Sequence, residues 1–91
     1  MYVEAKRIIN GKKYDTDTAK CVGEHMNSEA SIYEYVLQSL YQKRTGEFFL
    51  CGYGEFIGTE VTPLTLDEAK DWMERYSTAD EYEAIFGEVE E

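Results

Sequence analysis

The carboxylates are the side chains of this chain with the most evident chemical potential, because Asp and Glu outnumber Lys and Arg by 19 to 9. Residues 1–59 hold eight acids and seven bases, whereas residues 60–91 hold eleven acids and two bases. Nearly all of the formal net charge of −10 therefore lies in the final third of the chain. A one-sided negative field can steer and orient a cationic partner. The same carboxylates could equally form an ordinary solvated surface, so charge alone leaves both interpretations open.

Histidine, cysteine and glycine do not occur in a pattern that indicates a catalytic or metal site. His25 is the only histidine, and no carboxylate is obviously paired with it, so we expect it at a boundary or on the surface. Cys21 and Cys51 lack the spacing of a disulfide framework or metal site, and their apolar settings predict two reduced, buried thiols. The Gly-x-Gly at residues 52–54 is too short to indicate a phosphate loop. We therefore expect no catalytic residue, no metal and no cofactor, in a protein that is not an enzyme.

Two capping boxes predict the helices that must position the carboxylates of the final third. Thr65 at the N-cap and Glu68 three residues later open a helix over residues 66–76. At 100° per residue its apolar side chains share one face and most of its acids lie opposite. A second box, Thr78 with Glu81, opens a short helix that follows directly. The carboxylates expected to form an outward acidic face are Asp67, Asp71, Glu74, Asp80, Glu81 and Glu83.

The centre of the chain predicts an antiparallel sheet. Residues 48–51 are apolar on both faces of a strand, so this strand should be covered on both sides. A polar turn joins it to a strand near residues 35–43, and a third strand is expected at about residues 59–62 after an irregular, glycine-containing bend. Asn10-Gly11 predicts a further hairpin, because both central residues of a type I′ turn need positive φ.

One helix is expected between the first hairpin and the sheet. The Asp-Thr-Asp-Thr run at residues 15–18 has N-cap chemistry, and three apolar residues share a face at helical spacing over residues 16–26. Gly23 should weaken this helix by about 1 kcal/mol relative to alanine.

Together these elements predict an α+β fold in one compact domain over residues 1–91. We expect a small, mainly antiparallel sheet of three to five strands, one helix after the first hairpin and two C-terminal helices. The last few residues, 88–91, should be frayed. No signal peptide or membrane-spanning segment is visible, so the cytoplasm is the expected compartment.

The aromatic residues and the charge balance together define the partner that we expect. Binding to free nucleic acid needs a basic surface for phosphate neutralisation, so direct nucleic-acid binding is disfavoured. A basic protein surface fits an acidic body better. Large aromatic side chains often anchor such contacts, and the candidates here are Tyr33, Tyr35, Tyr53 and Trp72.

Four segments carry a resemblance that spans nearly the whole chain. They are residues 11–20, 39–50, 63–72 and 79–91; the second includes Tyr-Gln-Lys-Arg-Thr-Gly-Glu-Phe-Phe-Leu and the third reads Pro-Leu-Thr-Leu-Asp-Glu-Ala-Lys-Asp-Trp. Together they resemble a widespread family of small acidic proteins on phages and mobile elements of Gram-positive bacteria. Most members have no assigned activity, and some look like anti-CRISPR proteins, which bind a Cas effector and block it. The chain departs from the family after Gly52, where relatives commonly carry a Gly-Gly-Pro segment and a longer insertion, so the role of that insertion is not carried over.

The resemblance implies a non-enzymatic, phage-encoded inhibitor of a host defence complex, an anti-CRISPR protein acting in the bacterial cytoplasm. Cas effectors hold nucleic acid in basic channels. An acidic face that imitates phosphates, as a DNA mimic does, could occupy such a channel. Two other classes remain open at this point: a structural or regulatory adaptor of a mobile element, and a small counter-defence enzyme acting on nucleotides.

Overall fold

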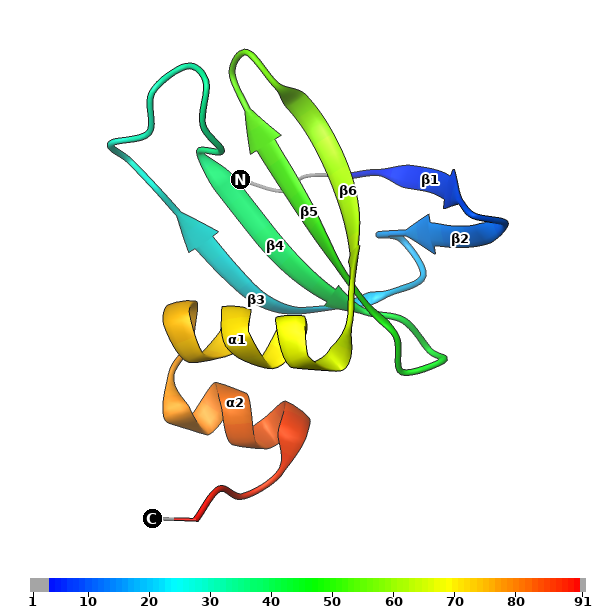
Figure 1. Cartoon of the computed structure of the whole chain (residues 1–91), viewed down its shortest axis with the longest axis vertical. Helices are drawn as coiled ribbons and strands as arrows, with labels where there is room; N and C mark the ends of the chain where they lie inside the picture. Colours follow the sequence, from blue (N-terminus) through cyan, green and yellow to red (C-terminus); the bar gives the residue numbers. More distant parts are fainter. Residues whose placement is uncertain (1–3, 91) are drawn as a thin grey trace.

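A four-stranded antiparallel sheet carries the other elements of the molecule (Figure 1). The structure is a computed structural model that describes residues 4–90. Within that range the α+β class and the antiparallel pairing are confirmed, with six strands in two sheets and two helices. The elements are β1 (Lys6–Ile9), β2 (Lys12–Asp15), β3 (Lys20–Met26), β4 (Leu37–Gln42), β5 (Phe48–Gly54), β6 (Gly58–Leu64), α1 (Leu66–Tyr76) and α2 (Ala79–Phe86).

Strands β3 to β6 pair in sequence order, and alternation along β5 gives this sheet two apolar faces. Phe48 and Leu50 belong to the core cluster on the side of α1, whereas Phe49 and Cys51 belong to the cluster on the opposite side. The prediction that this strand is covered on both sides is confirmed. Side chains packed on the α1 side include Leu40, Ala69, Trp72 and Met73, and those on the other side include Ala5, Tyr14, Leu37 and Tyr41.

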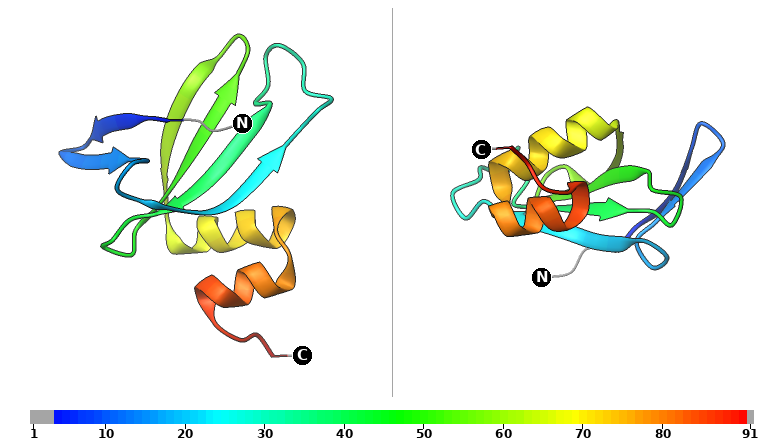
Figure 2. Two further views of the ribbon diagram at one scale, coloured as in Figure 1. Left: turned by 180° about the vertical axis from the view of Figure 1, so that it is seen from behind. Right: turned by 90° about the horizontal axis from the view of Figure 1, so that it is seen from below.

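Strands β1 and β2 form the predicted hairpin, which projects from the sheet at an edge away from α2 (Figure 2). Asn10 and Gly11 have φ values of 51° and 77°, as the expected type I′ turn requires. The hairpin is tied to the β4–β5 turn by an ion pair of 2.8 Å between Lys12 Nζ and Glu47 Oε2. Tyr14 of β2 is buried and packs edge-on against Phe49 with ring centroids 5.5 Å apart. The basic hairpin is therefore part of the folded domain.

The expected helix over residues 16–26 is wrong, because most of this stretch is the edge strand β3. The Asp15 carboxylate accepts a hydrogen bond of 2.9 Å from the Asp17 N–H, so the side chains expected to cap a helix instead close a turn between β2 and β3. After the turn, β3 pairs with β4 and bulges between Cys21 and Gly23. Backbone pairing with an available neighbour overrides the short apolar spacing that favoured a helix.

Gly23 has a packing role that its place in β3 explains. A Cβ atom built at Gly23 would lie 2.8 Å from Trp72 Cζ3 and 3.2 Å from Met73 Sδ. The absent side chain thus lets α1 press its two large buried residues directly onto the strand.

The irregular, glycine-containing stretch expected before β6 is a tight turn at residues 55–57 that ends at Gly58 with a φ of 76°, and it contains no bulge, since β5 and β6 pair without a register shift up to Gly54 and Gly58. Gly52 instead makes room for another side chain, because a Cβ there would lie 2.8 Å from Tyr35 Cε1. Pro63 lies inside β6, where it causes no gap in pairing because β6 is an edge strand with one neighbour.

Both predicted capping boxes are present. In each box the threonine hydroxyl oxygen accepts from the N3 backbone N–H, and the N3 glutamate accepts from the threonine N–H. The two helices differ in burial: α1 buries Ala69, Trp72 and Met73, whereas no residue of α2 is fully buried. Residues 87–90 form neither helix nor strand, and residue 91, also expected to fray, lies outside the described range.

Candidate functional site

Four of the six predicted carboxylates point to solvent from the two helices. Asp67, Asp71 and Glu74 lie on α1 opposite its buried residues, and Asp80 lies in the first turn of α2. We call these four residues the acidic helical surface. The ion pairs within residues 4–90 are made by Glu47, so none of the four carboxylates forms an ion pair with a Lys or Arg of that range. This arrangement leaves four negative charges available to a partner.

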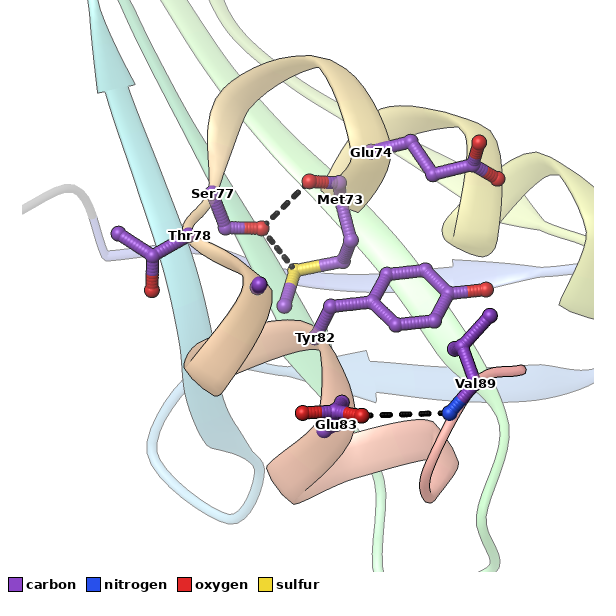
Figure 3. A pocket seen from close by; sticks show the side chains of 8 residues that line it. Met73, Glu74, Ser77, Thr78, Tyr82, Glu83 and Val89 are labelled. Carbon is purple, nitrogen blue, oxygen red and sulfur yellow. Dashed lines mark hydrogen bonds between the residues drawn. The ribbon is translucent and has the colours of Figure 1, made fainter. Parts of the chain in front are cut away.

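The other two predicted carboxylates each accept a hydrogen bond from a backbone N–H near one end of α2. Glu81 Oε1 accepts from the backbone N–H of Thr78 at 2.9 Å, as the capping box requires. Glu83 Oε2 accepts from the N–H of Val89 at 3.2 Å, a bond that holds the segment after α2 against the helix (Figure 3). Part of the role of both carboxylates is therefore structural.

A cleft of about 490 Å³ lies between α1 and α2 and is bordered by two of these acids (Figure 3). Glu74 comes from α1 and Glu83 from α2, with Met73 and Tyr82 among the other lining residues. The Ser77 hydroxyl donates to the Met73 carbonyl at 2.6 Å, so this hydroxyl satisfies a helix terminus. Carboxylates beside an apolar lining favour a cationic side chain with an aliphatic stem.

The four predicted aromatic anchors are not brought together. Tyr33 is 67 % exposed and Tyr35 is half-buried, and both lie in the loop before β4. Tyr53 is half-buried against the core cluster on the face away from α1. Trp72 is only 8 % exposed and is a core residue, so the prediction that it lies at an exposed contact is wrong. Its indole Nε1–H is buried without a hydrogen-bond partner inside the described range.

Tyr35 is fixed by its hydroxyl and by its ring. The hydroxyl donates to the Glu60 carboxylate, and the ring lies over Gly52 of β5. Burial of the phenol, together with the hydrogen bond to Glu60, raises the pKa of Tyr35 to about 12. The side chain is therefore a neutral hydrogen-bond donor at physiological pH.

A second depression, of about 300 Å³, gathers residues that sequence reasoning largely missed. We call it the tyrosine pocket; its lining includes His25, Tyr33, Glu34, Tyr35, Gln38 and Tyr76. His25 stacks on Tyr76 with ring centroids 4.0 Å apart, so the histidine is a boundary residue as expected. The sequence signal for the pocket is the alternation of β3, which becomes readable only when residues 20–26 are assigned to a strand.

The two cysteines occupy different environments. Cys51 is fully buried, and this burial raises the pKa of its thiol. Cys21 is exposed on β3, so the prediction that both thiols are buried is wrong for this residue. No group of three or more His, Cys, Asp or Glu side chains within residues 4–90 could hold a metal ion.

Comparison of the chain with protein-family models, curated proteins and solved structures gave no match. Membership of the phage and mobile-element family therefore stays a prediction from the four sequence segments. None of the helices in the described part of the chain is long and apolar enough to cross a membrane.

Proposed function

We propose that this chain is a non-enzymatic, phage- or mobile-element-encoded inhibitor of a host defence complex, and that a CRISPR–Cas effector is the target. The inhibitor occupies a basic channel of the effector with the acidic helical surface and thereby competes with nucleic acid. The observation that carries the proposal is the set of outward carboxylates on two capped helices, which form no ion pair with a Lys or Arg of residues 4–90.

The geometry supports electrostatic competition because the charges sit on regular structure. α1 is anchored to the sheet by Ala69, Trp72 and Met73, so the opposite face is held in a fixed orientation. Fixed charges lose little conformational entropy on binding, in contrast to acids on a disordered tail. Cas channels bind the phosphate backbone through its charge and shape, and a rigid acidic surface can offer both features.

The test is a triple charge reversal with a control of equal net charge. Asp67→Lys, Asp71→Lys and Glu74→Lys together reverse three of the four charges of the acidic helical surface. Glu4→Lys, Glu29→Lys and Glu55→Lys change the net charge equally, at exposed acids outside both helices. Each protein is titrated into purified Cas effectors of Gram-positive bacteria, and target-DNA binding by the effector is measured at several salt concentrations.

We expect the parent and the control to block DNA binding, with inhibition that falls as salt rises. The helical triple variant should inhibit more weakly and with a flatter salt dependence. Equal inhibition by the helical variant and the parent would exclude the acidic helical surface as the binding site. If no effector is inhibited by the parent, and the chain instead captures a protein of its own mobile element, the adaptor alternative is favoured.

A further inference from the structure

The tyrosine pocket lies at one end of a row of residues that crosses the sheet on the helix side; His25 and Gln38 of this row form its floor. His25, Gln38, Gly52 and Glu60 are successive partners across β3, β4, β5 and β6. The neighbouring row on the same face contains Gly23 and is covered by Trp72 and Met73 of α1. Because α1 ends at Tyr76, the helix does not cover the part of the row that contains His25 and Gln38, and these two residues line the depression.

Three tyrosine rings form the walls above this floor. The Tyr76 ring stacks on His25, and the Tyr35 ring is held over Gly52 by the hydrogen bond of its hydroxyl to Glu60. The Tyr33 ring packs edge-on against Phe56, with centroids 5.2 Å apart. Each ring is fixed by a specific contact, so the pocket is formed before a ligand arrives.

The polar groups at the pocket are mainly hydrogen-bond acceptors without a cation. Glu34 Oε1 accepts from the Ser31 N–H at 3.1 Å, and its second oxygen has no partner among the residues that the structure describes. The Gln38 side-chain amide also makes no hydrogen bond inside residues 4–90. No Lys or Arg of the described range lines the pocket; the Arg75 side chain borders a separate depression together with Asp71 and Glu68.

We infer that the tyrosine pocket binds the guanidinium group of an arginine side chain from a protein partner. A guanidinium offers five N–H donors in a planar fork, which suits the free Glu34 oxygen and the Gln38 carbonyl oxygen. Its flat cation stacks on tyrosine faces by cation–π attraction. A phosphate or another anion is disfavoured because Glu34 lines the pocket and Glu60 holds one of its walls, in a chain of net charge −10.

The inference deepens the proposed function, because a basic channel is rich in arginine, but its test does not depend on any effector. The isolated, ¹⁵N-labelled chain is titrated with N-acetyl-argininamide at millimolar concentration, with sodium chloride matched in ionic strength as the blank. Amide chemical shifts are followed. N-acetyl-lysinamide and N-acetyl-citrullinamide serve as comparison ligands, since the citrulline side chain keeps the planar shape of arginine without its charge.

Three variants of the chain assign the binding to the pocket. Tyr33→Leu removes an exposed ring and should weaken argininamide binding roughly two- to fivefold. Glu34→Gln keeps the acceptor for the Ser31 N–H but removes the charge, and should weaken it by about the same factor. Glu29→Gln is the matched control, because Glu29 is an exposed acid of the same loop that does not line the pocket.

We expect saturable shifts at His25, Tyr33 to Tyr35, Gln38 and Tyr76, strongest for the arginine ligand, weaker for lysine and weakest for citrulline. Equal binding of the citrulline ligand, shifts located elsewhere, or equal weakening by Glu34→Gln and Glu29→Gln would overturn the inference. If argininamide binds the pocket but no effector is inhibited, the pocket stands and the proposed function fails. The reverse result leaves the acidic helical surface in place and removes the pocket.

Discussion

The close contact between β3 and α1 depends on the absence of a side chain at Gly23. A Gly23→Ala variant would place its Cβ 2.8 Å from the edge of the Trp72 ring, which is closer than packed carbon atoms allow. The ring is buried and cannot turn into solvent, so α1 must shift. We expect a loss of about 1–3 kcal/mol in the free energy of unfolding, measured by urea denaturation.

A double-mutant cycle shows whether the Trp72 ring causes this loss. Trp72→Phe removes the part of the ring that the new methyl group would strike, so Gly23→Ala should cost less in the Trp72→Phe background than in the parent. Costs that add independently, or a Gly23→Ala variant as stable as the parent, would contradict the close approach of α1 to β3.

Glu47 gives a pH dependence that can be assigned to one carboxylate. Hydrogen bonds from Lys12, Thr45 and Lys43 lower the pKa of Glu47 from its ordinary value of 4.5 to about 2. Because the folded-state pKa lies below the unfolded value, these bonds contribute stability above pH 4.5 that is lost as the pH falls toward 2. In urea denaturation, Glu47→Gln should be less stable than the parent above pH 4.5, and this difference should close between pH 4.5 and 2.

The matched control for this titration is Glu29→Gln, which removes an exposed acid that has no ion pair in the described part of the chain. The control should follow the parent across the whole pH range. A stability difference for Glu47→Gln that does not change with pH would show that the lost contribution is packing of the side chain and not its charge.

For single residues, the sequence predicted which face of a helix a side chain occupies better than it predicted how far that side chain is buried. The 100° spacing correctly put Asp67, Asp71 and Glu74 opposite the buried face of α1. Trp72 lay on the flank of that face by the same arithmetic, yet its ring is buried. A large side chain on a flank can reach the core when the facing strand offers space, and Gly23 provides that space here. The angular position of a residue on its helix says nothing about the shape of the surface that the helix packs against.

At the scale of elements, the sequence predicted a turn or a helix end correctly where the contacts that close it are made by residues next to it in the chain. The Asn10-Gly11 turn and both capping boxes are closed by neighbouring residues, and all three were predicted correctly. Strand β3 was predicted as a helix because its stability comes from pairing with β4, which begins eleven residues after β3 ends. The tyrosine pocket was missed for the same reason, since its floor forms only when β3 and β4 pair and bring His25 beside Gln38.

The two helices should respond differently to the loss of their caps. Thr65→Ala and Thr78→Ala each remove a side chain that accepts from the N3 backbone N–H, a loss of typically about 1 kcal/mol. Because α1 is packed on the sheet, Thr65→Ala should lower global stability. Because α2 buries no residue completely, Thr78→Ala should mainly open α2 locally, and amide hydrogen exchange should be faster only in residues 79–86.

The capping interpretation has a conservative control. Thr78→Ser keeps a hydroxyl at the N-cap and should retain most of the parent's exchange protection in α2. Equal exchange in Thr78→Ala and the parent would show that packing of Phe86 on Phe48, with ring centroids 5.4 Å apart, holds α2 without its cap.

For the whole molecule, the acidic helical surface and the tyrosine pocket offer a cationic partner two kinds of interaction. The acidic helical surface acts at a distance, because its four carboxylates form no ion pair within residues 4–90 and lie in the third of the sequence that holds most of the net charge of −10. The tyrosine pocket acts only on contact, because ring stacking and hydrogen bonds need a guanidinium in place. Both surfaces include residues of α1, which contributes three carboxylates to one and Tyr76 to the other.

These two kinds of interaction predict a separation of rate constants once the target is in hand. Asp71→Asn with Glu74→Gln should slow association with the effector and flatten its salt dependence while dissociation changes little, because long-range attraction acts before contact. Tyr33→Leu should leave association nearly unchanged and speed dissociation roughly two- to fivefold, because the stacking contact forms only in the bound state and its removal weakens the complex. Stopped-flow binding at several salt concentrations measures both constants. If Tyr33→Leu and the carboxylate pair change the same rate constant, the two surfaces do not play separate roles in the complex.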